Sequence, residues 1–257
     1  RFARQPPHGQ ATGLTDSSHQ GPNPPGVADT AQLAGVPGSD ERNKKLYRNR
    51  FDATDRQRKD AVWRVVVKNF LQRWVRPTDV VLDIGCGYGE FLNHIKCARR
   101  IGVDLNADGR NSLDPDVEFH TADVRDLSFL EPASVDVVFT SNLMEHLPSK
   151  RDVEAMLEEA HRVLKPGGSL IAMGPNVRFV AGEYWDFWDH LTPITDRSLV
   201  ELLEHIDYDV VNCYPKFLPY TTRSSIPKSL WLVRGYVRFP PAWRVLGKQF
   251  LVRARRD

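Results

Sequence analysis

The chain has 257 residues, of which 41% are hydrophobic, and its 35 Lys and Arg nearly balance its 33 Asp and Glu for a net charge of +2. No stretch approaches the ~18 to 20 apolar residues that a membrane-spanning helix needs, and the first residues lack the pattern of a secretory signal. The three cysteines have no metal-ligand spacing and are expected to be reduced thiols. We therefore expect a soluble, cytoplasmic protein of one or two domains.

The chain is expected to begin with a disordered tail, residues 1–40, followed by a single domain over residues 41–257. The tail is rich in Pro, Gly, Gln and Ser and has no apolar periodicity, so it buries too little apolar surface to offset the entropy lost on ordering. Charge dominates from Glu41 to Asp60 and suggests a solvated helix. From Val62 to Trp74 apolar residues recur at helical spacing, which predicts a helix that covers the edge of a sheet or the mouth of a binding site.

The segment Val81–Phe91 reads VLDIGCGYGEF, an apolar strand that reaches Asp83 and is followed by a glycine-rich turn before a helix. Three glycines stand at alternate positions, Gly85, Gly87 and Gly89. Such glycines let the backbone approach a ligand closely, because a side chain there would collide with it. The dinucleotide fingerprint has its third glycine where this chain has Glu90. The loop therefore predicts a ligand site that need not cradle a pyrophosphate.

Three further strands also end in polar residues. A short apolar strand in Arg100–Asn106 reaches Asp104, twenty-one residues after Asp83. A carboxylate at this distance is placed to accept hydrogen bonds from the two hydroxyls of a ribose. The later strands are expected at Val117–Thr121, before Asp123, and at Val135–Thr140, before Ser141 and Asn142. Four strand ends should therefore meet at one crevice.

A fifth block, HRVLKPGGSLIAMGPN from His161, completes the pattern. A helix should close at Lys165-Pro166, turn at Gly167-Gly168 and continue as another strand. The repeated strand and helix pattern describes one doubly wound α/β sheet.

These five blocks, in this order, resemble the class I S-adenosylmethionine-dependent methyltransferases of the type 11 group, whose fourth strand runs into a helix start that reads Glu145-His146-Leu147 here. The resemblance covers about residues 60–215, with a terminal strand near 248–255. It implies a doubly wound, seven-stranded Rossmann-like sheet, mostly parallel with the last strand antiparallel. It also implies S-adenosylmethionine as the cofactor.

The resemblance further implies the cofactor-binding residues, position by position. They are Asp83, Gly85, Gly87 and Gly89 for the methionine portion, Asp104 for the ribose, Asp123 and Val124 for the adenine, and also Leu105, Ser141 and Asn142. The chain departs from the family after the second strand, because Ala107–Asp116 contains Gly109 and Pro115 and is too broken for the usual helix.

Two insertions, at about residues 177–195 and 216–247, are expected to build the acceptor site, since elements beyond the carboxyl ends of the strands do so in this fold. The first insertion packs four aromatic residues into five positions, Tyr184, Trp185, Phe187 and Trp188. A helix capped at Thr195 or Asp196 follows. Aromatic rings beside carboxylates suit a sugar, whose C–H face packs on a ring. The alternative is that these rings only seal the cofactor cleft.

The chemistry requires a proton acceptor if the methyl group goes to an alcohol. His146, after the fourth strand, and His190, in the aromatic insertion, are the histidines expected near the site. A neutral imidazole titrates near the operating pH and can act as a general base. We prefer His190, with Asp189 orienting its ring. Each histidine can instead be structural, or the acids with a histidine can hold a divalent ion such as Mg²⁺ that lowers the pKa of the hydroxyl.

The charge is unevenly distributed along the chain. Residues 216–257 carry ten Lys or Arg and one acid, a net charge of +9, which leaves −7 for the rest. The interleaved aromatic residues are Trp231, Tyr236, Phe239 and Trp243. We favour a solvated cationic face beside a packing stripe, and the alternative is peripheral contact with an anionic membrane or acceptor. No recognised nucleic-acid module accompanies the charge, so no nucleic acid partner is expected.

The sequence therefore predicts an S-adenosylmethionine-dependent O-methyltransferase that acts on a hydroxyl of a saccharide or other small molecule. Its insertions loosely resemble those of bacterial saccharide O-methyltransferases. One alternative is methylation of a carbon, nitrogen or carboxylate on a quinone-like or lipid acceptor. Another, of a different class, is a catalytically silent cofactor-binding partner subunit. The acceptor, the metal requirement and the oligomeric state do not follow from the sequence.

Overall fold

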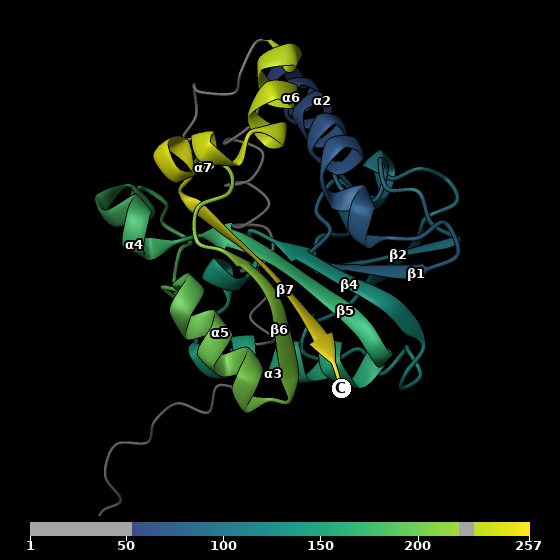
Figure 1. Cartoon of the computed structure of the whole chain (residues 1–257). Helices are drawn as coiled ribbons and strands as arrows, with labels where there is room; N and C mark the ends of the chain where they lie inside the picture. The colour runs from purple at the N-terminus through teal and green to yellow at the C-terminus, as the bar shows by residue number, and fades with distance from the viewer. Residues whose placement is uncertain (1–52, 221–228) are drawn as a thin grey trace, which may run out of the picture. The chain divides into compact units, whose positions relative to one another are not determined.

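The computed structural model describes residues 53–220 and 229–257 (Figure 1). The expected tail at 1–40, and the portion of the charged segment before residue 53, lie outside the described residues. Within the described ranges a single sheet contains seven strands, β1 (Val80–Ile84), β2 (Arg99–Asp104), β3 (Glu118–Thr121), β4 (Val135–Ser141), β5 (Leu164–Pro175), β6 (Tyr208–Tyr214) and β7 (Gln249–Arg256).

The strands are ordered β3-β2-β1-β4-β5-β7-β6. The first five are mutually parallel, and β7 runs antiparallel between β5 and β6. The mostly parallel sheet with an antiparallel last strand is thus confirmed. Central parallel strands are covered on both faces, which explains the nearly continuous apolar character of β1 and β4. Because parallel strands end at one edge, the segments that follow β1, β2, β3 and β4 meet there.

Helices cover both faces of the sheet and bury two separate apolar clusters. On one face lie α2 (Ala53–Asn69), the 3₁₀ turn η2 (Leu71–Trp74), α6 (Leu230–Arg238) and α7 (Pro240–Leu246). On the other lie α3 (Lys150–Val163) and α5 (Asp196–His205). Figure 1 shows α2 and α6 packed side by side. The expected apolar stripe from Val62 to Trp74 does pack on the sheet, and Trp63 is buried against Phe139 of β4.

The short elements follow local signals. Ser149 accepts a hydrogen bond from the Asp152 amide and caps α3, and Thr195 caps α5 in a reciprocal pair with Ser198, as its sequence predicts. The remaining short elements are the 3₁₀ turns η3 (Ala107–Ser112), η4 (Met144–His146) and η5 (Ala181–Asp186), and the single-turn helix α4 (Val177–Val180). The broken segment after β2 is therefore one 3₁₀ helix in place of the family's usual helix, as predicted.

Three local predictions were wrong. The glycine loop is followed not by a helix but by turns, in which the amides of Asn93 and Ile95 donate to the carbonyls of Gly89 and Phe91. The Glu-His-Leu segment forms the 3₁₀ turn η4, and α3 begins only after Ser149. Strand β5 begins at Leu164, before the expected Gly167-Gly168 turn, which forms a bulge within the strand.

No helix among residues 53–220 and 229–257 combines the length and the apolar character needed to cross a membrane. The three cysteines are unpaired thiols.

Candidate active site

The glycine loop after β1 has the backbone conformation that its sequence suggests. Gly85, Gly87 and Gly89 have φ of +73°, +54° and +83°, a region that favours glycine. A Cβ on Gly85 would lie 2.8 Å from Leu143, and one on Gly89 would lie 2.4 Å from Leu113. At Gly87 the nearest atom would be 3.7 Å away. A side chain at Gly85 or Gly89 would displace a leucine, whereas the space at Gly87 is open, and the positive φ favours glycine at all three positions.

Three carboxyl groups gather around this loop. Asp83 is buried at the end of β1, and burial, together with the nearby carboxylates of Glu90 and Asp104, raises its pKa well above the usual value. Burial would also raise the pKa of Glu90, but the Lys59 ammonium, 2.7 Å away, outweighs it and lowers that pKa. The concentration of acids makes the region favourable for a bound cation.

Asp104 lies at the end of β2, directly beside the loop. Its carboxylate accepts hydrogen bonds from the amides of Gly87, at 2.9 Å, and of Asn106, at 2.8 Å. The following residue, Leu105, is exposed. The carboxylate thus ties the loop after β1 to the end of β2, at the place where the sequence predicts a ribose.

The segments after β3 and β4 complete this edge of the sheet. The guanidinium of Arg125 donates two hydrogen bonds to Asp123 and holds the pKa of that carboxyl below its usual value, and Val124 is buried. After β4, Ser141 is half-buried, and Asn142 has a φ of +50° with its amide donating to Met173. The loop residues predicted for the cofactor therefore lie at the ends of β1 to β4.

A cavity of about 660 Å³ begins beside Asn142 and extends under the C-terminal helices. Its walls come from α2, from the end of β4, and from both insertions, and its lining is mainly apolar. The lining residues include Val62, Trp63, Val66, Met173, Phe187, Leu218, Tyr220, Trp231, Leu232, Val233, Tyr236, Phe239 and Leu246. The described part of the second insertion thus supplies a wall of the cavity.

The aromatic cluster of the first insertion contributes less than its sequence suggests. Of its four rings only Phe187 lines the cavity. Tyr184 is fully buried and donates to the Thr192 carbonyl, whereas Trp185 and Trp188 are exposed and are not among the lining residues. The four rings are therefore divided between core, cavity and surface, because they lie in a tight turn that points consecutive side chains in different directions.

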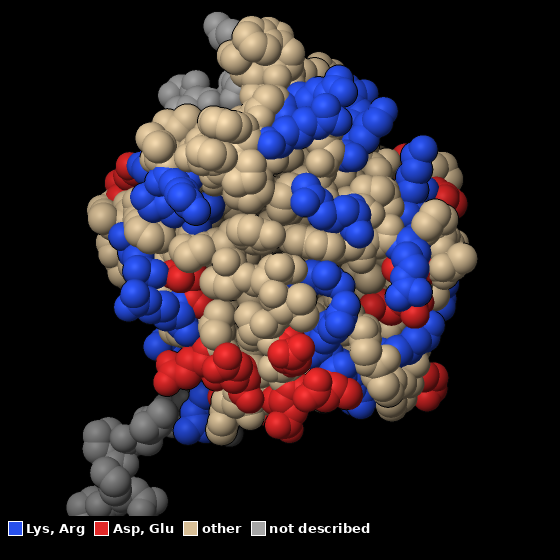
Figure 2. Space-filling view, in the orientation of Figure 1, with Lys and Arg blue, Asp and Glu red and all other residues tan. Residues whose placement is uncertain are grey.

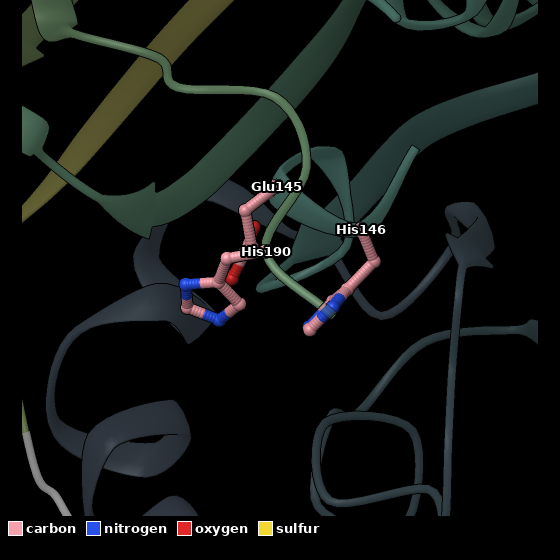
Figure 3. Close-up of side chains that lie close together, drawn as sticks. All are labelled: Glu145, His146 and His190. Carbon is pink, nitrogen blue, oxygen red and sulfur yellow. The ribbon is translucent and has the colours of Figure 1, made fainter. Parts of the chain in front are cut away.

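Glu145, His146 and His190 come together on the wall of this cavity (Figure 3). One ligand atom from each lies within 4.8 Å of the others, and Glu145 and His190 are buried. The backbone joins them, because the Glu145 carbonyl accepts from the amides of Leu191 and Thr192, at 2.7 and 3.1 Å. These bonds fix the first insertion against η4, so residues 44 positions apart share one site.

His146 is held in a defined orientation by Asp189. Its Nδ1 lies 2.9 Å from the Asp189 carbonyl oxygen and 3.3 Å from the carboxylate. Since a carbonyl oxygen only accepts, Nδ1 carries the proton, and the neutral ring has its lone pair on Nε2. The sequence predicts that Asp189 orients His190, and the structure places Asp189 against His146. The ring of His190 is stacked on Phe187, with centroids 4.8 Å apart.

Sequence reasoning did not select Glu145 or Lys59 as site residues. Glu145 had a signal, since it directly precedes His146 at the end of β4. The sequence carries no signal for Lys59, because this residue reaches Glu90 only through the packing of α2 beside the glycine loop. The apolar wall from α6 likewise depends on a helix that is remote in the sequence.

Comparison with known proteins agrees with this geometry. Residues 82–172 match the family described as "Methyltransferase domain". The "Uncharacterized 37.1 kDa protein in transposon TN4556" of Streptomyces fradiae is 34% identical over 128 residues, which cover 46% of this chain and 33% of that protein. The demethylmenaquinone methyltransferase of Symbiobacterium thermophilum is 27% identical over 193 residues, covering 64% of this chain and 74% of that enzyme. The chain thus spans only a third of the first of these relatives.

Among solved structures, a SAM-dependent methyltransferase from Archaeoglobus fulgidus superposes with a TM-score of 0.57 at 20% identity, covering 75% of this chain and 92% of that one. The likeness shows the fold, including the sheet on which the loops after β1 to β4 are mounted. Residues 82–172, which include the glycine loop at the end of β1, are thus similar to a methyltransferase domain, and the chain has the fold of a SAM-dependent methyltransferase.

Proposed function

We propose that the protein transfers a methyl group from S-adenosylmethionine to a hydroxyl of a small molecule whose body is mainly apolar. The observation that carries the proposal is the position of Glu145, His146 and His190. They form a polar cluster on an otherwise mainly apolar cavity wall, next to Asn142 at the end of β4. A pocket with few polar groups orients a ligand through those groups and binds its body through apolar contacts.

The residues around the glycine loop fit the cofactor. Its methionine portion carries an ammonium and a sulfonium, and the carboxyl groups of Asp83, Glu90 and Asp104 gather where that portion would lie, so that a bound ammonium would favour the ionised form of the buried Asp83. The open space at Gly87 allows backbone approach. In this proposal Asp104 accepts from the ribose hydroxyls, Asp123 and Val124 frame the adenine, and Leu105, Ser141 and Asn142 complete the site. When bound, S-adenosylmethionine supplies a methyl group on a positively charged sulfur, which leaves as a neutral thioether.

The proposed reaction needs one proton transfer and one alignment. Nε2 of His146 would accept the proton of the acceptor hydroxyl and so make its oxygen nucleophilic toward the methyl group that S-adenosylmethionine would supply. The resulting imidazolium keeps the Asp189 carbonyl and carboxylate beside its Nδ1. His190 and Glu145 line the same wall and orient the hydroxyl. The geometry thus favours His146 over His190 as the base.

The same three residues offer an alternative way to activate the hydroxyl. Two imidazole nitrogens and one carboxylate can bind a divalent ion, which would lower the pKa of a coordinated hydroxyl. Imidazole ligands suit Zn²⁺ or another transition metal better than Mg²⁺, which prefers oxygen. Treatment with a chelator followed by dialysis distinguishes the two mechanisms, because the base mechanism predicts unchanged turnover and the metal mechanism predicts turnover that returns only when metal is added.

The mainly apolar lining bears on the choice of acceptor. A bare saccharide would place many hydroxyls against apolar side chains and leave them without partners, which costs about 1–3 kcal/mol for each buried group. Trp185 and Trp188, the rings expected to stack on a sugar, are not among the cavity-lining residues. We therefore favour a hydroxylated aromatic or lipid-like acceptor over a saccharide.

A second candidate function is methylation of a carbon on a quinone-like acceptor. It is supported by the apolar cavity and by the resemblance to the demethylmenaquinone methyltransferase. The same base would serve, since removing a phenolic proton activates the ring carbon beside it as well as the oxygen.

The test is a transfer assay with ¹³C-methyl-labelled S-adenosylmethionine and separate pools of phenols and reduced quinones, hydroxylated lipids, and saccharides. The proposal predicts label in a phenol or lipid pool, on oxygen, as seen from the carbon chemical shift of the product. His146→Ala should abolish most of the transfer, whereas His205→Ala, an exposed change on α5, should not. Label on carbon would support the second candidate, and label in the saccharide pool would refute the apolar acceptor.

A further inference from the structure

The helices α6 and α7 carry a concentration of exposed apolar side chains. Six of the eleven exposed large hydrophobic side chains of the described residues lie in this short stretch, Leu230, Trp231, Leu232, Phe239, Val245 and Leu246. Trp231 is 73% exposed, Phe239 60% and Val245 78%. Single exposed apolar residues are ordinary, but a contiguous group marks a surface that binds something. We call these six residues the apolar patch.

The same helices present positive charge. Arg234, Arg238 and Arg244 are exposed, and residues 229–256 contain no Asp or Glu. In Figure 2, tan and blue atoms cover the end of the molecule where Figure 1 places α6 and α7, and the largest red area lies at the opposite end. Apolar side chains interleaved with arginines, without acids, are the composition of helices that lie in the headgroup region of an anionic membrane.

The apolar patch is also continuous with the acceptor cavity. Trp231, Leu232 and Phe239, on and just after α6, are exposed and line the cavity, and Leu246 of α7 does the same. A surface that covered the patch would therefore lie directly over an opening of the cavity. An apolar acceptor could pass from that surface into the cavity without crossing water.

We propose that α6 and α7 dock the protein on an anionic lipid bilayer, with the apolar patch in the interfacial region, the arginines beside lipid phosphates, and the acceptor cavity open toward the lipid. Charge favours this occupant over a second copy of the chain. A symmetric dimer through the apolar patch would bring together the three exposed arginines of each chain, six in all. Residues 229–256 contain no Asp or Glu to neutralise them. The acceptor route rests on the proposed function, but docking itself does not.

The test is co-sedimentation of the 257-residue chain with vesicles, compared between phosphatidylcholine alone and phosphatidylcholine mixed with phosphatidylserine. Binding should require the anionic lipid and weaken with salt. Each basic residue near such a surface contributes about a five-fold factor to binding. The variant Arg234→Glu/Arg238→Glu/Arg244→Glu should therefore bind at least ~100-fold more weakly. Val245→Glu, which adds a carboxylate to the patch without touching the cavity lining, should also weaken binding.

The matched control is Lys150→Glu/Arg151→Glu/Arg197→Glu, which reverses three exposed charges on α3 and α5. It changes the net charge by the same amount and should bind vesicles like the wild type. Melting temperature and turnover on a detergent-dispersed acceptor report separately on folding and on the proposed function. Docking is overturned if the wild type ignores anionic vesicles or if the control loses binding equally. It is also overturned if Val245→Glu only abolishes a dimer seen by light scattering.

Discussion

Replacing His146 by Ala tests the proposed chemistry most directly. The ring lines the cavity, and Asp189 fixes its Nδ1 proton, so Nε2 is the atom that can accept a proton from the acceptor. Loss of a general base typically lowers kcat by ~10²- to 10⁴-fold, which corresponds to about 2.7–5.5 kcal/mol of activation free energy. Cofactor affinity should stay near wild type, because the glycine loop and Asp104 lie on other segments.

Asp189→Ala should lower kcat less than His146→Ala does, because of how Asp189 contacts the His146 ring. The variant keeps the backbone carbonyl that accepts from Nδ1, so the tautomer of His146 is preserved. It loses the carboxylate 3.3 Å from that atom. At this distance a charge pair is worth about 1 kcal/mol in bulk water and about 5 kcal/mol at an effective dielectric constant of 20. Since both side chains are partly exposed, we expect about 1.4–2.7 kcal/mol, or a 10- to 100-fold lower kcat.

The assay is steady-state turnover on the identified acceptor, with S-adenosylmethionine affinity and melting temperature measured for each variant. Added imidazole should partly restore turnover to His146→Ala, because the substitution opens space in a cavity that already admits small molecules. A purely structural histidine would not be rescued in this way. Wild-type kcat in His146→Ala, or a larger loss in Asp189→Ala than in His146→Ala, would refute the assignment of His146 as the base.

Three other predictions concern the cofactor and the insertion. Asp104→Ala should weaken S-adenosylmethionine binding at least ten-fold in titration calorimetry, because each charge-assisted hydrogen bond is worth roughly 1.5–3 kcal/mol. Unchanged binding would show that Asp104 does not bind the ribose. Burial raises the pKa of Asp83, and a bound ammonium would favour its carboxylate, so binding should release a proton. Affinity should then rise as the pH rises through that pKa, and the dependence should vanish in Asp83→Asn. Trp188→Ala removes an 83% exposed ring and should leave the melting temperature and the KM for the acceptor unchanged. A raised KM would show that Trp188 does contact the acceptor.

The sheet and the glycine loop at its edge could be predicted because their signals are local. Apolar runs that end in Asp83 or Asp104 specify buried parallel strands, and glycines at alternate positions specify a backbone of positive φ. Each signal spans a few residues and fixes conformation through backbone sterics alone. The strand ends then meet at one edge because parallel strands always do.

The acceptor side was decided only by tertiary packing. The sequence shows His146 and His190 but not that Glu145 joins them, nor that Asp189 turns toward His146. It shows an aromatic cluster, but the turn that carries it sends Tyr184 into the core and Trp188 into solvent. These contacts depend on how segments far apart in the chain pack together. The periodicity or spacing of residues within one segment does not predict such packing. The sequence by itself therefore determined the sheet and the glycine loop at its edge, and the tertiary structure decided the shape, the polarity and the polar cluster of the cavity that we propose for the acceptor.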